Sequence, residues 1–309
     1  MADFRREFEN EMGNDYRGEA VFGEMLSKHT SLSIGGPADI YVVPSDAISL
    51  KKCLVFSIER NIAVVVLAGG TNVIISDRGI KGMVVSLKHF NMIKTLNETN
   101  DSADLFVESG VPLQKLVNHC IENGYSGLEG LSGIPGTIGG AIIGNSGSFG
   151  QEVKDVVESL IVMNRSGMIK RLEKEEFSFG YRTSTIEEGL IVLSSNMVFK
   201  KADAALLREK AAEYISKKKN IQPMAVRSAG CVYKNPVDGS AGRLIEASGC
   251  KGLRVGDIEV SSLHANYFIN KGKGTASEFV ELMKLVEKKV AKNTGIHLEP
   301  EVRIINDGH

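Results

Sequence analysis

Short apolar runs and helically spaced apolar positions alternate along most of the chain. Runs rich in β-branched residues predict strands at 39–43, 63–67, 83–87, 105–108, 157–163, 190–199, 265–269 and 302–305. Apolar positions at helical spacing predict a helical lead over 3–26 and helices at about 46–60, 112–123, 203–219, 242–248 and 277–292. Helices that alternate with strands indicate an α/β or α+β fold.

Some of these elements carry end signals and faces that a structure can check. Asp46 is expected to cap the helix at 46–60, whose Ile48, Val55 and Phe56 should point inward. The run at 63–67 should be a buried strand that feeds a tight turn. The helix at 277–292 should bury one face and end at a glycine cap, Gly295. That face consists of Phe279, Leu282, Met283, Val286 and Val290.

Composition narrows the class of protein. The 309 residues suffice for two or three domains, and 37 basic against 38 acidic residues leave no basic surface for nucleic acid. No apolar run approaches the roughly 18 residues of a spanning helix, so no membrane insertion is predicted. The four cysteines form no C-x-x-C pair and the six histidines have no metal-ligand spacing. We therefore expect a cytoplasmic protein without a structural metal; its oligomeric state is not encoded in any pattern that we find.

The most informative segment is a glycine cluster. Seven glycines fall within residues 133–150, interleaved with apolar residues that include Ile134, Ile138 and Ile142. A flexible linker would be rich in serine and charge, whereas this segment should be buried. Glycine lets the backbone approach a ligand closely, and its N–H groups can converge on an oxyanion. We interpret the cluster as the cradle of a large cofactor.

A second glycine turn follows the predicted strand at 63–67. Gly69 and Gly70 are followed by Thr71 and Asn72, whose small polar side chains could help to hold a phosphate. An ordinary tight turn is an equally good interpretation of this motif alone. Neither a G-x-G-x-x-G opening a helix in the early chain nor a G-x-x-x-x-G-K-[ST] motif is present. The two glycine segments together suggest one extended cofactor lying between two subdomains.

Other candidate residues are ambiguous by themselves. Arg182 follows Tyr181, but an arginine in such a stretch is more often a surface or salt-bridged residue. Cys231 follows a glycine and could be approached by a ligand, yet a lone cysteine is usually a small buried hydrophobe. Glu299 and Glu301 should point to the same side of an extended chain, where carboxylates are normally solvated.

In combination, these segments resemble one family. Eight motifs occur in order between about 30 and 305: TSLSIGGPAD (30–39), AGGTN (68–72), GIPGTIGGA (133–141), GYRTS (180–184), SAGCVYKNP (228–236), AGRLIE (241–246), HAN (264–266) and LEPEVR (298–303). Any one of them is weak, but the ordered set resembles the UDP-N-acetylenolpyruvoylglucosamine reductases of peptidoglycan precursor synthesis. The chain resembles their shorter subclass, since the stretch between Arg182 and Cys231 lacks an inserted substrate-contacting loop.

The resemblance implies an α+β flavoenzyme. Its FAD-binding part would be a two-subdomain fold of the vanillyl-alcohol-oxidase (PCMH) type, followed by a C-terminal α/β substrate domain. The expected divisions are a helical lead at 1–29, FAD-binding subdomains at 30–88 and 89–202, and a substrate domain at 203–309. NADPH would reduce FAD, which would pass a hydride to UDP-N-acetylglucosamine enolpyruvate and give UDP-N-acetylmuramate.

The resemblance also implies roles for individual residues. Arg182 would polarise the substrate carboxylate, and Glu301 would be an electrostatic or proton-relay partner. Cys231 stands where the family usually has the serine that donates a proton; a thiol is the stronger acid, with an ordinary pKa of about 8.5, so we expect Cys231 to be the general acid. Substrate contacts are expected at Tyr181, Lys234 and Asn235. Residues expected to hold FAD are Gly69, Gly70, Thr71, Asn72, Ile134, Pro135, Gly136, Thr137, Gly139, Gly140, Asn145 and Gly147.

Two alternatives use the same scaffold. A flavin oxidase would pass electrons to O₂, and a nucleotide-sugar-binding protein would have lost the chemistry. The presence of Arg182, a proton donor and Glu301 together argues against the loss of chemistry.

Overall fold

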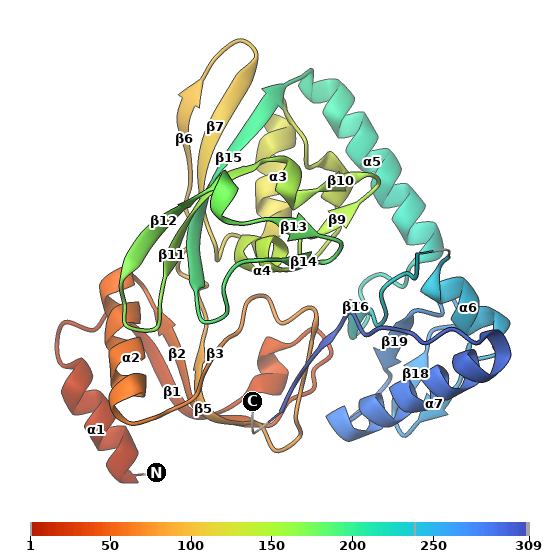
Figure 1. The fold of residues 1–309 in the computed structure, drawn as a ribbon, viewed down its shortest axis with the longest axis horizontal. Helices are drawn as coiled ribbons and strands as arrows, with labels where there is room; N and C mark the ends of the chain where they lie inside the picture. Colours follow the sequence, from red (N-terminus) through yellow and green to blue (C-terminus); the bar gives the residue numbers. More distant parts are fainter. Residues whose placement is uncertain (1, 238, 307–309) are drawn as a thin grey trace. The chain divides into compact units, whose positions relative to one another are not determined.

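The computed structural model describes residues 2–237 and 239–306 and divides the chain into two compact units (Figure 1). The first unit comprises the residues up to Phe22, Ile40–Gly69 and Gly82–Ser216. The second comprises Gly23–Asp39, Gly70–Lys81 and the residues from Lys217 onward. Each unit is therefore assembled from segments that are far apart in the sequence. No helix among the described residues is both long and apolar enough to cross a bilayer.

The amino-terminal part of the first unit forms a small sheet with two helices. Its sheet has the strand order β1-β2-β5-β3. The elements are α1 (Ala2–Met12), β1 (Gly18–Met25), β2 (Pro37–Pro44), α2 (Ala47–Glu59), β3 (Val64–Val66) and β5 (Ile80–Val85), and a 3₁₀ turn (Leu26–His29) follows β1. Phe8 of α1 packs edge-on against Phe22 of β1 and Phe56 of α2, with ring centroids 5.8 and 5.1 Å apart. These aromatic contacts join the three elements in one core.

Two expectations for this region are wrong. The helical lead predicted over 3–26 ends at Met12, and residues 18–25 form strand β1, in which Ala20, Phe22 and Glu24 alternate with exposed positions. Val21 and Phe22 fit a helical spacing on paper, but pairing within the sheet selects the period-two pattern. Ile48 does not point inward, since 68% of its surface is exposed.

The beginning of α2 behaves as predicted. The Asp46 carboxylate accepts a hydrogen bond from the Ser49 N–H at 2.7 Å, which caps the helix, and Phe56 is buried. Strand β3 is less buried than expected because Val66 exposes 41% of its surface. The run of β-branched residues thus predicts the position of the strand correctly but not its burial, which is only partial.

A larger antiparallel sheet forms the rest of the first unit. Its order is β12-β11-β15-β7-β6, and β8 also pairs with β15. The strands are β6 (Ile93–Glu98), β7 (Ser102–Glu108), β8 (Tyr125–Ser126), β11 (Val157–Met163), β12 (Ile169–Glu173) and β15 (Ile191–Lys201). Along β7, buried Ala103, Leu105 and Val107 alternate with less buried residues and share a core with α3 (Leu113–Glu122) and α4 (Ile138–Ile143). Both helices therefore cover one face of this sheet.

Smaller elements complete the first unit. Two hairpins, β9 (Gly147–Ser148) with β10 (Gln151–Glu152) and β13 (Phe179–Gly180) with β14 (Thr183–Ser184), follow α4 in sequence. Three 3₁₀ turns lie at Glu129–Leu131, Val153–Asp155 and Lys174–Glu176. Helix α5 (Ala204–Ile221) continues from this unit into the second.

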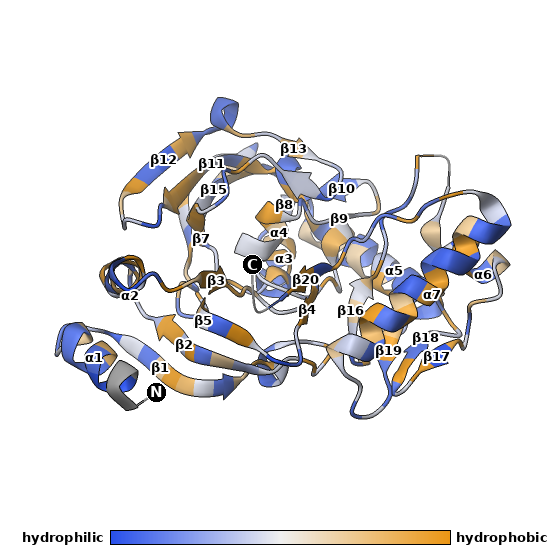
Figure 2. Ribbon diagram, turned by 60° about the horizontal axis from the view of Figure 1, so that its bottom comes forward, coloured by the Kyte–Doolittle hydropathy of each residue, from blue (hydrophilic) through white to orange (hydrophobic). Residues whose placement is uncertain are grey.

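The second unit has an antiparallel sheet of order β16-β19-β18-β17 and a long helix, α7 (Ala276–Thr294). Its other elements are β16 (Ser228–Cys231), α6 (Ala241–Ala247), β17 (Arg254–Val255), β18 (Ile258–Val260) and β19 (Tyr267–Asn270). All five residues predicted for the buried face of α7 are buried, and Gly295 caps the helix with a φ of +72°. Figure 2 shows hydrophobic and hydrophilic residues alternating along α7. A separate parallel pair joins β4 (Val73–Ile75) to β20 (Arg303–Ile305).

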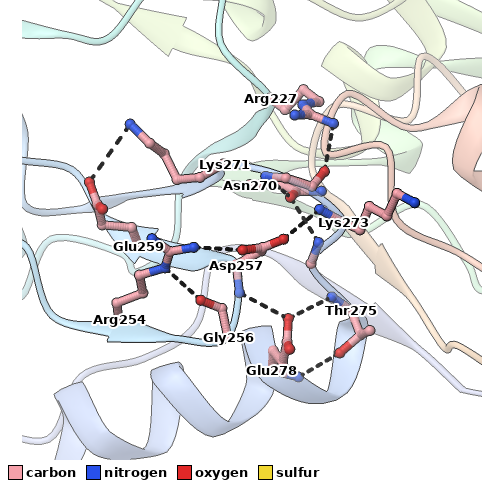
Figure 3. A network of polar contacts seen from close by, with 12 residues as sticks. Arg227, Arg254, Gly256, Asp257, Glu259, Asn270, Lys271, Lys273, Thr275 and Glu278 are labelled. Atoms are coloured by element: carbon pink, nitrogen blue, oxygen red, sulfur yellow. Dashed lines mark hydrogen bonds and ion pairs between the residues drawn. The ribbon is translucent and has the colours of Figure 1, made fainter.

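A polar network holds the amino-terminal end of α7 (Figure 3). Thr275 and Glu278 form a reciprocal capping box, in which each side chain accepts from the backbone N–H of the other at 3.1 Å. Asp257 accepts from the Lys273 N–H and from Arg254, and these contacts lower the pKa of Asp257. Asp77, which follows β4, caps the same helix end by accepting from the N–H groups of Ala276 and Ser277 at 2.7 and 3.0 Å. The loop after β4 is thereby fixed to α7.

Candidate functional site

The structure brings the two glycine-rich segments together. A Cβ atom at Gly69 would lie 2.7 Å from the Cα atom of Gly136, closer than two such carbons can approach. The contact is backbone against backbone, so Gly69 cannot carry a side chain without moving the other segment. Gly139 makes a similar approach to Ser109, whose Cβ atom would be 2.9 Å away from an added Cβ. The glycines in these segments therefore permit close packing of the chain.

The cluster is not loop throughout. Residues 138–143 form helix α4, in which Ile138, Ala141 and Ile142 are buried at the i, i+3, i+4 spacing. This helical spacing is visible in the sequence, but the many glycines around it favoured the interpretation of the segment as a loop. The first N–H groups of α4 bond to the turn before α3: Ile138 donates to the Val111 carbonyl and Gly139 to the Ser109 carbonyl, at 2.9 and 2.8 Å.

Several polar groups of this region are suited to a ligand. Within residues 2–237 and 239–306, the N–H groups of Gly136, Thr137 and Gly140 donate no hydrogen bond. Over the same residues, the hydroxyl of Ser109 is buried without a partner. Closely spaced backbone donors that no side chain covers can bind a pyrophosphate. The residues present thus fit a dinucleotide such as FAD.

Arg182 is anchored to the second half of the glycine cluster. It lies in the turn between β13 and β14 with a φ of +58°, a conformation that a bulky residue rarely adopts. Its Nη2 atom donates to the Gly147 carbonyl at 2.9 Å, and its guanidinium lies 5.2 Å from the centre of the Tyr181 ring. Asn145, fully buried with a φ of +40°, donates to the Gly180 carbonyl at 2.9 Å. The turn that carries Arg182 is consequently tied to the predicted cofactor residues Asn145 and Gly147.

In the second unit, the backbone of Val232, which follows Cys231, is hydrogen-bonded to the backbone of Glu301. The Val232 carbonyl accepts from the Glu301 N–H at 2.8 Å, and the Val232 N–H donates to the Asn266 carbonyl at 2.9 Å. Asn266 is only 2% exposed. Its side chain accepts from the Tyr233 N–H at 3.0 Å and donates to the Tyr233 carbonyl at 2.7 Å. The segment that follows Cys231 is therefore held from both sides.

Asn72 contributes to the same assembly. Its Nδ2 atom donates to the Glu301 carbonyl at 3.1 Å, and its own carbonyl accepts from the Arg303 N–H at 3.1 Å. The side chain predicted to bind a cofactor thus also positions the segment that carries Glu301 and leads into β20. A cofactor role for Asn72 remains a prediction.

The predicted substrate residues Tyr181, Lys234 and Asn235 have contacts of their own or are exposed. Lys234 pairs with exposed Glu299 at 2.6 Å. Asn235 accepts from the Ala241 N–H at 3.0 Å and so caps α6. Tyr181 is 48% exposed. No group of histidine, cysteine, aspartate or glutamate suited to a metal ion occurs among the described residues. Asn266 and Tyr267 were missed as site residues, although Asn266 ends the quoted HAN motif and Tyr267 follows it.

Comparison with known proteins identifies both parts of the chain. Residues 222–305 match the family model for the UDP-N-acetylenolpyruvoylglucosamine reductase C-terminal domain, and residues 38–173 match an FAD binding domain. The UDP-N-acetylenolpyruvoylglucosamine reductase of Rubrobacter xylanophilus is 40% identical over 291 residues, which cover 93% of this chain and 96% of the relative. That of Geotalea uraniireducens is 36% identical and covers 94% and 95%, respectively.

Solved structures agree. The UDP-N-acetylenolpyruvylglucosamine reductase (MurB) of Thermus caldophilus superposes with a TM-score of 0.80 at 32% identity, covering 94% of this chain and 99% of that one. The 6-hydroxy-D-nicotine oxidase of Arthrobacter nicotinovorans shares the fold alone, with a TM-score of 0.54 at 12% identity over 92% of this chain and 88% of that one. The predicted fold class, an FAD-binding part followed by a reductase C-terminal domain, is confirmed. The chain belongs to the UDP-N-acetylenolpyruvoylglucosamine reductase family.

Proposed function

We propose that this chain reduces the enolpyruvyl double bond of UDP-N-acetylglucosamine enolpyruvate with NADPH and gives UDP-N-acetylmuramate, a precursor of peptidoglycan. FAD, when bound, would supply the redox chemistry by carrying a hydride from NADPH to the vinyl CH₂ carbon. The neighbouring carbon must then take up a proton. The observation that carries the assignment to this chain is that the backbone N–H of Glu301 donates to the carbonyl of Val232, the residue that follows Cys231.

Arg182 is the proposed partner of the substrate carboxylate. Hydride addition to the vinyl carbon drives negative charge onto the adjacent carbon and its carboxylate, and a guanidinium stabilises that charge. The hydrogen bond to the Gly147 carbonyl and the left-handed backbone of Arg182 favour one side-chain position. A cation placed in advance does not have to reorganise during the reaction.

Cys231 is the proposed proton donor. It is half-buried, whereas Cys53, Cys120 and Cys250 are buried, so it is the most accessible thiol of the four. After the proton has left Cys231 Sγ for the substrate carbon, a thiolate remains and must be reprotonated from solvent. The nearby Glu301 is suited to relay that proton or to disfavour the thiolate. In this proposal, residues 30–88 and 89–202 bind FAD, and residues 203–309 bind the substrate.

The role of Cys231 is tested with Cys231→Ala and Cys231→Ser in the FAD-loaded enzyme. Flavin bleaching by NADPH should remain at the wild-type rate in both variants, because it needs no proton from this side chain. Flavin reoxidation by the enolpyruvyl substrate should slow by about 10²- to 10⁴-fold in the alanine variant, the usual contribution of a general acid. The serine variant should retain activity. If the alanine variant reoxidises its flavin at nearly the wild-type rate, Cys231 is not the acid.

The same preparation separates the reductase from an oxidase. A reductase consumes NADPH in proportion to the enolpyruvyl substrate and produces no peroxide, whereas an oxidase consumes O₂ without that substrate. We place the reaction in the cytoplasm. Cys53, Cys120 and Cys250 are buried free thiols, which is consistent with a reducing compartment.

A further inference from the structure

Tyr267 stands directly opposite the proposed acid. Strands β16 and β19 are antiparallel, and their register pairs Cys231 with Tyr267. Residues that face each other across an antiparallel pair project to the same side, with Cβ atoms about 4.5–5.5 Å apart. The Tyr267 phenol and the Cys231 thiol interact electrostatically, and this interaction contributes to the raised pKa of Tyr267. The register places the two residues side by side, and the interaction indicates that the phenol lies near the sulfur.

The backbone around Tyr267 is fixed. The Tyr267 N–H donates to the His264 carbonyl at 3.0 Å, and its carbonyl accepts from the Ser261 N–H at 2.8 Å. Its neighbours Asn266 and Phe268 are buried. The phenol is therefore a rigid partner for the thiol.

Three titratable groups face Tyr267. They are the Cys231 thiol, the Glu301 carboxylate and His264, whose ring centre lies 5.0 Å from that of Tyr267. Burial, followed by the interactions with Cys231 and Glu301, raises the pKa of Tyr267. Burial lowers the pKa of His264, which favours its neutral form. The hydroxyl of Tyr267 consequently remains protonated and serves as a donor.

We propose that Tyr267 is a positioning residue that orients the Cys231 thiol and stabilises the thiolate left when the proton has moved to the substrate carbon. This inference rests on the proposed role of Cys231 as the acid. A hydrogen bond from Tyr267 occupies one face of the sulfur, so the S–H bond points elsewhere. The negative charge of Glu301 opposes a thiolate, and the donated hydrogen bond offsets part of that repulsion.

The test measures the acidity of the thiol apart from turnover. Cys231 in the FAD-loaded enzyme is alkylated with iodoacetamide across a range of pH, and mass spectrometry quantifies the label on its peptide. Only the thiolate reacts, and the other three cysteines are buried. In Tyr267→Phe, the midpoint of labelling should move up by about 1 to 2 pH units, as expected for the loss of a hydrogen bond to a charged group. Flavin reoxidation by substrate should slow by about 10- to 100-fold, and flavin reduction by NADPH should not change.

Tyr16→Phe is the matched control. Tyr16 also interacts electrostatically with a cysteine, Cys53, but both residues lie in the first unit. It should leave the Cys231 labelling midpoint unchanged. An unchanged midpoint in Tyr267→Phe overturns the proposal, as does a shifted midpoint with wild-type reoxidation.

A double variant separates this proposal from the role of Cys231. In a Cys231→Ala background, Tyr267→Phe should have no further effect on flavin reoxidation, because the group that it positions is gone. A further loss of tenfold or more would show that Tyr267 acts on the reaction by another route and would overturn the inference. Wild-type reoxidation in Cys231→Ala itself would refute Cys231 as the acid, whatever the labelling midpoint shows.

Discussion

The contact between Gly69 and Gly136 gives the sharpest prediction about the cofactor. In Gly69→Ala, the new Cβ would lie 2.7 Å from the Gly136 Cα and 3.2 Å from the Gly136 carbonyl carbon. Ordinary contact begins at 3.4 Å, so the two segments must separate by about 0.7 Å. Both sides are backbone, and no side chain can rotate away. Overpacking of this kind costs about 1–3 kcal/mol.

That strain should appear as weaker FAD binding, because the N–H groups of Gly136 and Thr137 move with the displaced segment. A loss of about 1–3 kcal/mol corresponds to an affinity about 5- to 150-fold lower. The assay titrates the apoprotein with FAD and monitors binding by the quenching of flavin fluorescence. Urea unfolding of the apoprotein measures any loss of stability separately.

Gly144→Ala is the matched control from the same cluster. Its φ is −93°, and an added Cβ would lie 3.4 Å from the Gly140 carbonyl oxygen, so alanine fits there. We expect FAD affinity in this variant to stay within about twofold of wild type. The reasoning fails if Gly69→Ala binds FAD as tightly as wild type. It also fails if Gly144→Ala loses as much affinity, since the effect would then come from glycine content rather than from one contact.

Two further predictions concern stability. Glu129 is 4% exposed and accepts from the Gly127 N–H at 2.8 Å; burial alone would raise its pKa, but this bond and its other hydrogen bonds lower it. Glu129→Gln should therefore reduce the free energy of unfolding by about 1–3 kcal/mol at pH 7. The difference should shrink once the pH falls below about 4.3, the ordinary pKa of glutamate, and should be lost as the pH falls through the lowered pKa of the folded protein; a constant difference in urea unfolding down to pH 3 would contradict this. Asp77→Ala should cost about 1 kcal/mol through the lost cap on α7, and Asp77→Asn less, since asparagine also caps; equal losses in urea unfolding would indicate that the cap is not the cause.

The sequence was sufficient wherever the signal was local. The buried face of α7 and its Gly295 cap follow from spacing within one helix, and the Asp46 cap follows from a side chain three residues before its partner. Strand β1 was mistaken for helix because both periods fit its few apolar residues, and only pairing with β2 decides between them. The exposure of Ile48 was likewise missed, since which side of α2 faces the core depends on the tertiary packing.

For the site, the sequence suggests candidate residues but not the contacts that hold them in place. Arg182, Cys231 and Glu301 could be named from motifs, and so could the glycines. The contact between Asn72 and the Glu301 carbonyl could not be predicted, because 229 positions separate the two residues and neither carries a pattern pointing to the other. Tyr267 was missed for the same reason: its importance lies in a strand register that brings it opposite Cys231.

The geometry at Cys231 is imposed by its neighbours rather than by the cysteine itself. The register of β16 and β19 shifts between Ser228 and Cys231, where Gly230 has a φ of +75°. Beyond this bulge the regular pairing stops, and the Asn266 side chain bonds both backbone groups of Tyr233 in its place. The residues that aim position 231 are thus a glycine and an asparagine that take no part in proton transfer. Such a frame accepts any small side chain with an acidic hydrogen, which is why a thiol can stand where the resemblance leads us to expect a hydroxyl.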